Sequence, residues 1–304
     1  MNECPTDVLY EIIKYNSTQN FINLCLSDKE YYKFYYNDVI WSNLCVRDFI
    51  EMIDIRDNTY LDLYKLCFGL VNFKKLLNSK RYSSIKDLYL TNSIDYIGKR
   101  LQVIPNIIGF PNLYGLNFCQ NKIKYIPFEV CNLTNLKVLN LEDNLILIMN
   151  PEITRLINLE SLDLSKNQIG KIPTEIFELT NLKTLNLSHT QIKMIPKDMC
   201  KLINLNNLDL SNNLIKNKDL NIYNLTNLIS INFKNNQIST IISDIKKLTN
   251  LEYINFSNNK LNIVPIHLIS LTKLKFVDLS NNNFKSAFIP NNMKHINIDA
   301  KKYR

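Results

Sequence analysis

The sequence is poor in the residues that flexible, fibrous or disulfide-linked chains use most. Among its 304 residues are five glycines and one tryptophan, and its seven cysteines include no Cys-x-x-Cys pair. So little glycine argues against a flexible or collagen-like chain. An odd number of cysteines without paired spacing favours reduced, mostly buried thiols.

Long apolar runs are missing as well. No uninterrupted run approaches the ~20 residues that a membrane span needs, and Glu3 and Asp7 stand where a secretory signal would be apolar. We therefore expect a soluble cytoplasmic chain with no membrane partner. The abundance of Asn, Ile and Lys is typical of an A/T-rich genome, such as that of an amoeba or one of its large viruses, and for a viral chain the location would be the host cytoplasm.

Residues that carry most enzyme chemistry are scarce. The three histidines, His189, His267 and His295, lie far apart in the sequence without cysteine or carboxylate at ligand spacing, and no glycine-rich phosphate loop occurs. We expect no catalytic residue, no metal and no cofactor.

The formal net charge of +8 is unevenly placed. Residues 1–84 carry 10 basic and 11 acidic side chains, whereas residues 85–304 carry 26 and 17. Scattered lysines are typical of a solvated surface, although they also permit an acidic or phosphorylated partner. We predict no nucleic-acid partner.

One period dominates the second part of the chain. Leucines recur with a strict 23-residue period, at Leu113, Leu136, Leu159, Leu182, Leu205, Leu228, Leu251 and Leu274. Further apolar residues follow three and five places after each of them. This L-x-x-L-x-L pattern predicts a short strand whose alternate side chains point inward. Each 23-residue coil is numbered here from its leucine, so that Leu113 is position 1 of coil 1.

Position 9 of each coil predicts a buried polar ladder. A buried asparagine amide can both donate to and accept from the main chain of the neighbouring coil. Thr190 interrupts the series in coil 4, where a hydroxyl can do only part of the same work. The predicted ladder comprises Asn121, Asn144, Asn167, Asn213, Asn236, Asn259 and Asn282.

The second half of each coil predicts a single helical or irregular turn. In coil 1, Ile126-Pro127 ends the inward segment, and Val130 and Leu133 follow at helical spacing. In coil 5, Lys218 and Asp219 replace the Ile-Pro pair, so we expect a local bulge there.

This consensus, repeated over most of the second part of the chain, resembles the 23-residue intracellular class of leucine-rich repeats. The resemblance implies an α/β solenoid of nine or so coils, a horseshoe with a parallel concave sheet that binds a partner protein. It places the solenoid at residues 85–304, with an irregular first coil over 85–112 that opens on Ile85, Leu88 and Leu90. The regular coils begin at 113, and a C-terminal cap covers 288–304, in which Met293, Ile296 and Ile298 predict a shortened strand.

Ligand choice should rest on the side chains that the concave sheet presents. Position 5 is Asn or Asp in all eight coils and so favours regularity over a particular ligand. Aromatic anchors on an exposed sheet are typical of interaction hot spots, although Tyr253 and Phe276 could equally cover the surface near the C-terminal cap. The candidate target-binding residues are Glu142, Asp143, Lys166, His189, Lys234, Tyr253 and Phe276.

Residues 1–50 follow another pattern, with apolar residues at helical spacing. Pro5-Thr6-Asp7 opens one predicted helix, and Ser27 with Glu30 forms the capping box of another. The order of the segments CPTDVLYEII, FINLCLS and NDVIWSNLCVRDF resembles the F-box, a small all-α module that binds the Skp-type adaptor of cullin–RING ubiquitin ligases. The implied adaptor-binding residues are Pro5, Val8, Leu9, Ile12, Ile13, Leu24, Trp41 and Leu44.

The two resemblances together predict a non-catalytic substrate receptor of a Skp–cullin–F-box ubiquitin ligase. Residues 51–84 would link the helical module to the solenoid, and the chain would be monomeric by itself. Two alternatives remain open. The N-terminal helices could serve only as a cap, and the repeats could form a signalling scaffold without any link to ubiquitin.

Overall fold

The computed structural model describes residues 90–105, 107, 110, 112–216 and 221–284, and the backbone of 296–297. The chain divides into two compact units, one of Met1–Leu90 with Asn106–Gly109 and one of Thr91–Pro105 with Phe110–Arg304. The second, here the repeat unit, holds nearly all described residues. The F-box-like segment 1–50, the linking segment 51–84 and the expected bulge at Lys218 and Asp219 lie outside the described residues.

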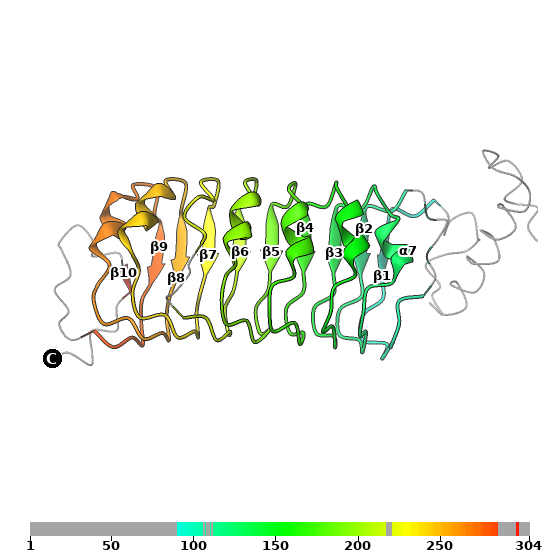
Figure 1. Ribbon diagram of the computed structural model, residues 1–304, viewed down its shortest axis with the longest axis horizontal. Helices are drawn as coiled ribbons and strands as arrows, with labels where there is room; N and C mark the ends of the chain where they lie inside the picture. The colour runs from blue at the N-terminus through cyan, green and yellow to red at the C-terminus, as the bar shows by residue number, and fades with distance from the viewer. Residues whose placement is uncertain are drawn as a thin grey trace, which may run out of the picture. The chain divides into compact units, whose positions relative to one another are not determined.

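A single parallel sheet runs the length of the repeat unit (Figure 1). Its ten strands pair strictly in chain order, each with the strand one coil later. Leu116 faces Leu139 and Leu139 faces Leu162, so the 23-residue sequence period is also the sheet register. The strands are β1 Ser93–Asp95, β2 Gly115–Asn117, β3 Val138–Asn140, β4 Ser161–Asp163, β5 Thr184–Asn186, β6 Asn207–Asp209, β7 Ser230–Asn232, β8 Tyr253–Asn255, β9 Phe276–Asp278 and β10 Ile296–Asn297.

Short helices form a second row beside the strands, as the sequence predicted (Figure 1). They start at coil position 16, and in four of them the residue before the start is a proline, which lacks an N–H that could extend the helix backwards. Each buries its position-18 side chain, as Val130 and Ile176 do. The helices are α7 Phe128–Cys131, η2 Pro151–Arg155, η3 Thr174–Glu178, η4 Lys197–Lys201, η6 Ser243–Lys247 and η7 Ile266–Ser270.

The core is a column of inward side chains between the two rows. Positions 4 and 6 are buried in every regular coil, and Phe233 and Phe256 stack at position 6 with ring centroids 5.1 Å apart. Each inward side chain packs against the coils before and after it, so neighbouring coils stabilise one another. Among the residues that the structure describes, no helix is both long and apolar enough to cross a bilayer.

The first coil begins later than the sequence indicated. The spacing predicts inward residues at Ile85, Leu88 and Leu90, but the strand is Ser93–Asp95 and Ile94 pairs with Leu116. Leu90 is 54% exposed. The apolar spacing before residue 91 imitates the repeat, whereas Ile94 and Tyr96 are the buried residues that fit the stack. At the other end, Ile296 pairs with Val277, which confirms the predicted short final strand at that residue.

Candidate functional site

The asparagine ladder at position 9 is present as predicted. Asn144 Nδ2 donates to the carbonyl of Phe118 in the coil before it, at 2.9 Å, and to the carbonyl of Leu141 in its own coil, at 3.1 Å. Its Oδ1 accepts from the backbone N–H of Ile123 at 2.9 Å. Both links to the coil before recur at Asn167, Asn213, Asn236, Asn259 and Asn282. Asn121 does the same against Tyr96, Lys99 and Leu101. These hydrogen bonds link each coil to the coil before it and so fix the spacing between coils.

Thr190 changes the ladder in the way a hydroxyl must. Its Oγ1 donates to Leu187 O within its own coil. The link to coil 3 is instead a backbone hydrogen bond from Gly170 N to Thr190 O at 2.8 Å. Gly170 adopts φ +68, a conformation that glycine takes without a steric penalty. The sequence pattern predicted the break but not the role of this glycine.

The side of the sheet opposite the core is the candidate binding surface, called the sheet face here. It comprises positions 3, 5 and 7 of each coil together with the turn residue at position 8. In β8, Tyr253 is exposed, Ile254 buried and Asn255 half-buried, which is the alternation expected of a strand with one solvated face. This face carries the residues that the sequence analysis named as target-binding candidates.

The Asn and Asp residues at position 5 form the frame of the sheet face. The side-chain oxygen of each accepts a hydrogen bond from the backbone N–H two residues later, as Asn140 does from Glu142 and Asp163 from Ser165, both at 2.9 Å. Asn186 Nδ2 also donates to Asp163 Oδ2 at 2.9 Å. Because these oxygens accept hydrogen bonds within the sheet, the residues maintain the turn, and the aspartates among them also add negative charge to the sheet face.

Three of the predicted target-binding residues share a strained backbone position. Asp143, Lys166 and His189 all stand at position 8, where the chain turns with φ between 53° and 55°. In coils 5 to 8 the same position is asparagine, a residue that tolerates this left-handed conformation well. Lysine, unlike asparagine, aspartate and histidine, is not enriched in this conformation, so the presence of Lys166 there calls for another explanation.

The predicted acidic and basic residues of coils 2 and 3 lie together. Lys166 Nζ is 2.7 Å from Glu142 Oε1, and the hydrogen bond with this carboxylate raises the pKa of Lys166. The thiol of Cys119 lies next to these carboxylates. Its pKa is raised mainly by burial, further by Glu142, and to a smaller extent by Asp163 and Asp143. Glu142 and Asp143 follow β3, and Asp163 ends β4, the strand paired with it, so the three form one acidic cluster on the sheet face, of which Lys166 neutralises a part.

The predicted aromatic pair is adjacent in space. Tyr253 and Phe276 are direct partners in the register of β8 and β9, and each is 44% exposed. Position 3 in the coils between them and the acidic cluster is small or polar, with Ser161, Thr184, Asn207 and Ser230. Lys234 is exposed at position 7 of coil 6.

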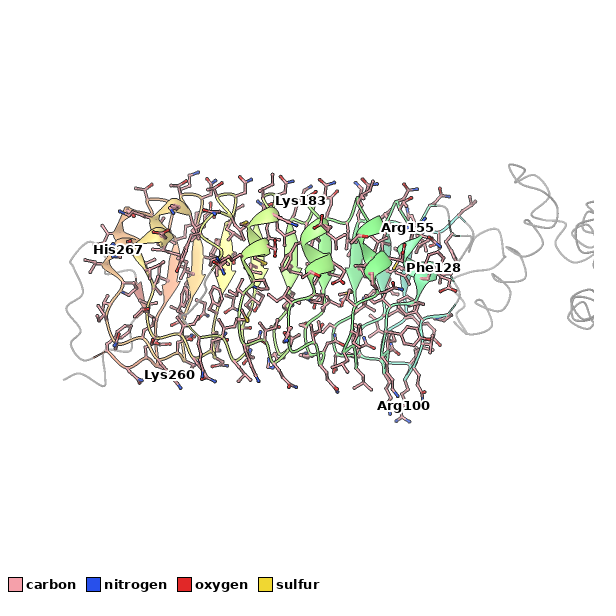
Figure 2. All side chains as sticks on the ribbon, viewed as in Figure 1. Arg100, Phe128, Arg155, Lys183, Lys260 and His267 are labelled. Atoms are coloured by element: carbon pink, nitrogen blue, oxygen red, sulfur yellow. The ribbon has the colours of Figure 1, made fainter. Side chains whose placement is uncertain are left out.

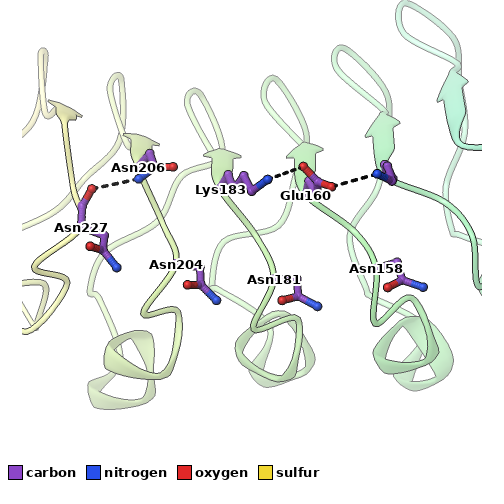
Figure 3. A pocket seen from close by; sticks show the side chains of 8 residues that line it. Asn158, Glu160, Asn181, Lys183, Asn204, Asn206 and Asn227 are labelled. Carbon is purple, nitrogen blue, oxygen red and sulfur yellow. Dashed lines mark hydrogen bonds and ion pairs between the residues drawn. The ribbon is translucent and has the colours of Figure 1, made fainter.

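Besides the sheet face, a polar groove runs along the edge where the strands begin (Figure 3). It has a volume of about 470 Å³ and is lined by Lys137, Asn158, Glu160, Asn181, Lys183, Asn204, Asn206 and Asn227. Glu160 lies 3.3 Å from Lys137 and 2.7 Å from Lys183, and hydrogen bonds from these lysines, Lys183 first, lower its pKa. In Figure 2, Lys183 lies at this edge, and Arg100 and Lys260 lie at the opposite one.

Asparagines at position 23 form an outer ladder in this groove. Asn158 Nδ2 donates to Thr134 O at 3.0 Å, and Asn181 Nδ2 donates to Ile157 O at 2.8 Å. The same link recurs at Asn204, Asn227 and Asn250. The repeat consensus contains this asparagine, but the sequence alone indicated no role for it. Because each of these amides donates to the coil before it, the outer ladder supports the stack.

The two described histidines lie on different sides of the solenoid. His189 ends a turn of the sheet face, whereas His267 lies in η7 on the helical side. Within the described ranges, no group of three or more His, Cys, Asp or Glu residues could hold a metal ion. The described parts of the molecule offer a rigid, regular surface.

Comparison with known families agrees with this geometry. The model described as "Leucine rich repeat" matches residues 157–215, and a second of the same description matches 250–271 and 273–296. The repeat unit is a leucine-rich-repeat solenoid. No curated protein matches the chain in sequence.

Several solved leucine-rich-repeat structures are similar to this solenoid. A leucine-rich-repeat protein of Leptospira interrogans is 27% identical with a TM-score of 0.63, over 71% of this chain and 62% of that one. Internalin C2 of Listeria monocytogenes is 26% identical with a TM-score of 0.59, over 69% and 90%. Another Listeria internalin, at 23% identity, a TM-score of 0.62 and coverage of 77% and 67%, shares the fold. This chain spans less than two thirds of the Leptospira protein.

Proposed function

We propose that the sheet face of the solenoid binds a target protein and that the chain is the substrate receptor of a Skp–cullin–F-box type ubiquitin ligase. One observation carries the first part: exposed aromatic residues stand on the sheet face beside the Asn/Asp frame, at position 3, which the frame does not use. Tyr253 and Phe276 are 44% exposed, although serine or threonine fills the same position in coils 3, 4 and 6. Exposed aromatic side chains on a rigid surface are the usual anchors of protein interfaces.

The second part rests on the order of apolar residues in 1–50, which resembles an F-box. In this proposal Pro5, Val8, Leu9, Ile12, Ile13, Leu24, Trp41 and Leu44 contact the adaptor. The solenoid then holds a target while the helices hold the ligase. The chain contributes proximity, because it keeps the target near the ubiquitin donor and performs no chemistry of its own.

Co-purification of the full chain with a Skp-type adaptor tests the ligase link. We expect a complex with the native chain and its loss in the double variant Ile12→Asp/Trp41→Ala. The matched control is Tyr253→Ser/Phe276→Ser, which alters the sheet face and should retain the adaptor. A native chain that binds no adaptor, yet captures a target lost on the control substitutions, would instead identify a signalling scaffold.

A further inference from the structure

The sheet face has a charge opposite to that of the rest of the repeat unit. It carries six carboxylates and two lysines, which are Asp95, Glu142, Asp143, Asp163, Asp209, Asp278, Lys166 and Lys234. The other described residues carry 17 lysines and arginines against eight carboxylates. A surface that stays acidic on an otherwise basic molecule attracts partners of positive charge and repels anions.

We infer that the target presents a basic, extended segment to the sheet face. This inference rests on the proposed target-binding function and names the class of its partner. Arginine or lysine side chains of the segment would meet the acidic cluster at one end of the face and the rings of Tyr253 and Phe276 at the other.

The acidic cluster supplies the first contact. Glu142, Asp143 and Asp163 lie in two adjacent coils, and all three raise the pKa of the Cys119 thiol beside them, after burial itself. The ion pair of Lys166 is with Glu142, at 2.7 Å. One lysine among three carboxylates leaves the cluster with a net negative charge. An incoming guanidinium can neutralise this charge through charge-assisted hydrogen bonds.

The aromatic pair supplies the second contact. Cations bind the faces of exposed aromatic rings, and Tyr253 and Phe276 are partners in register. Five strand steps separate β3, which precedes Glu142, from β8. At about 4.8 Å per step this is about 24 Å, the length of about seven residues of extended chain. Small or polar side chains at position 3 leave the path between the two contacts open.

Nucleic acid fits this surface poorly in spite of the basic chain. Its phosphates would meet the six carboxylates of the sheet face. Several lysines elsewhere are paired with carboxylates of the adjacent coil, as Lys183 is with Glu160, Lys201 with Glu178 and Lys275 with Glu252. Of the 17 basic side chains outside the sheet face, four pair with carboxylates of an adjacent coil, and the others are spread over the remaining faces.

Fluorescence anisotropy of the full-length chain tests the inference. The probe is an octapeptide of four serines flanked by two arginines at each end, and its counterpart has glutamates in place of arginines. We expect the arginine peptide to bind more tightly, with an affinity that falls as salt rises. The variant Glu142→Gln/Asp143→Asn/Asp163→Asn should bind it about tenfold more weakly, since three exposed charge pairs are lost.

Two controls make the result decisive. Asn already occupies the positions of Asp143 and Asp163 in other coils, for example Asn212 and Asn140, so the triple variant should keep the thermal midpoint of the native chain. The matched variant Glu152→Gln/Glu175→Gln/Glu178→Gln changes the charge equally on the helices of coils 2 and 3 and should bind like the native chain. The variant Tyr253→Ser/Phe276→Ser should also bind the arginine peptide more weakly than the native chain does.

Equal binding of the two peptides, an equal loss in the helix-side control, or competition by polyuridylate would overturn the inference. Its failure differs from that of the proposed function. A captured target that depends on Tyr253 and Phe276 but contacts them through an acidic or uncharged segment would refute only the basic partner. A captured target that ignores every sheet-face substitution would refute target binding at this surface.

Discussion

Lys166 Nζ lies 2.7 Å from Oε1 of Glu142, one coil earlier in the chain. The contact joins a left-handed turn residue to the carboxylate that follows the preceding strand. Two residues that the sequence offered as separate ligand contacts therefore act together, and the lysine limits the negative charge of the cluster around it.

Removal of this lysine should raise the affinity of the chain for a basic ligand without unfolding the chain. We expect Lys166→Gln to bind the arginine octapeptide more tightly than the native chain while the thermal midpoint stays nearly unchanged, because exposed ion pairs add little stability. Anisotropy and thermal denaturation measure the two effects. Lys171→Gln, an exposed lysine five residues later, is the control for net charge. An equal gain in both variants would show that the local pair has no special role.

The two asparagine ladders should contribute differently to the free energy of unfolding. Asn167→Ala removes the buried acceptor of the Ile146 N–H and one of the two amide donors to the carbonyl of Leu141, so we expect a loss of about 1–3 kcal/mol in the free energy of unfolding. Asn158→Ala removes one exposed hydrogen bond and should cost about 0.5–1 kcal/mol. Urea unfolding followed by circular dichroism compares them, and similar losses would contradict the distinction.

The turn at position 8 should be improvable by design. His189→Asn introduces the residue that takes φ 55° more readily than histidine, and we expect a stabilisation of up to about 0.5 kcal/mol. The reciprocal change, Asn258→His at φ 54°, should destabilise by a similar amount. Urea midpoints of the two variants check this. A stabilised His189→Asn chain that also loses its target would indicate that histidine is retained for binding.

The thiol of Cys131 should stay protonated and protected in the folded chain. Burial raises its pKa to about 11, and Glu152 adds to the shift. Since the folded pKa lies above the ordinary value of 9.0, this thiol contributes stability below pH 9 that is lost as the pH rises towards 11. At pH 8 we expect iodoacetamide to modify Cys131 at least tenfold more slowly than the partly exposed Cys200.

Peptide mass spectrometry of the alkylated chain gives both rates in one sample, and unfolding in urea should equalise them. A Cys131 that reacts as fast as Cys200 in the native chain would show that coils 1 and 2 open readily. The variant Cys131→Ala should lose less stability between pH 8.5 and 11 than the native chain does.

Most of the repeat unit could be predicted because one 23-residue pattern specifies strand, ladder and turn together. The strand, ladder and turn positions of coils 1 to 4 follow directly from residues such as Leu139, Asn144 and Pro173. The first coil was misplaced because Leu88 and Leu90 carry the same spacing as Ile94 and Tyr96, and only pairing with β2 distinguishes the two. Sequence spacing contains no information about which apolar pair has a neighbour to pack against.

The sequence predicted which residues lie on the sheet face, but not which of them contact one another. Tyr253 and Phe276 occupy the same position of consecutive coils, so their adjacency follows from the period. The pairing of Glu142 with Lys166 joins position 7 of one coil to position 8 of the next. This ion pair therefore depends on the left-handed backbone conformation of Lys166 at position 8, which the residue types do not specify. The role of Gly170 beside Thr190 likewise depends on backbone geometry that the residue types alone do not specify.

The uniform strand register makes the solenoid a molecular ruler. The separation between the acidic cluster and the aromatic pair equals a whole number of coils, so it can change only in increments of about 4.8 Å. Excision of residues 182–204, one complete coil, would bring the two contacts one increment closer while every remaining coil keeps its own fold. Ligand length in such a protein is therefore measured by counting repeats, and it can be lengthened or shortened by whole-coil duplication or loss.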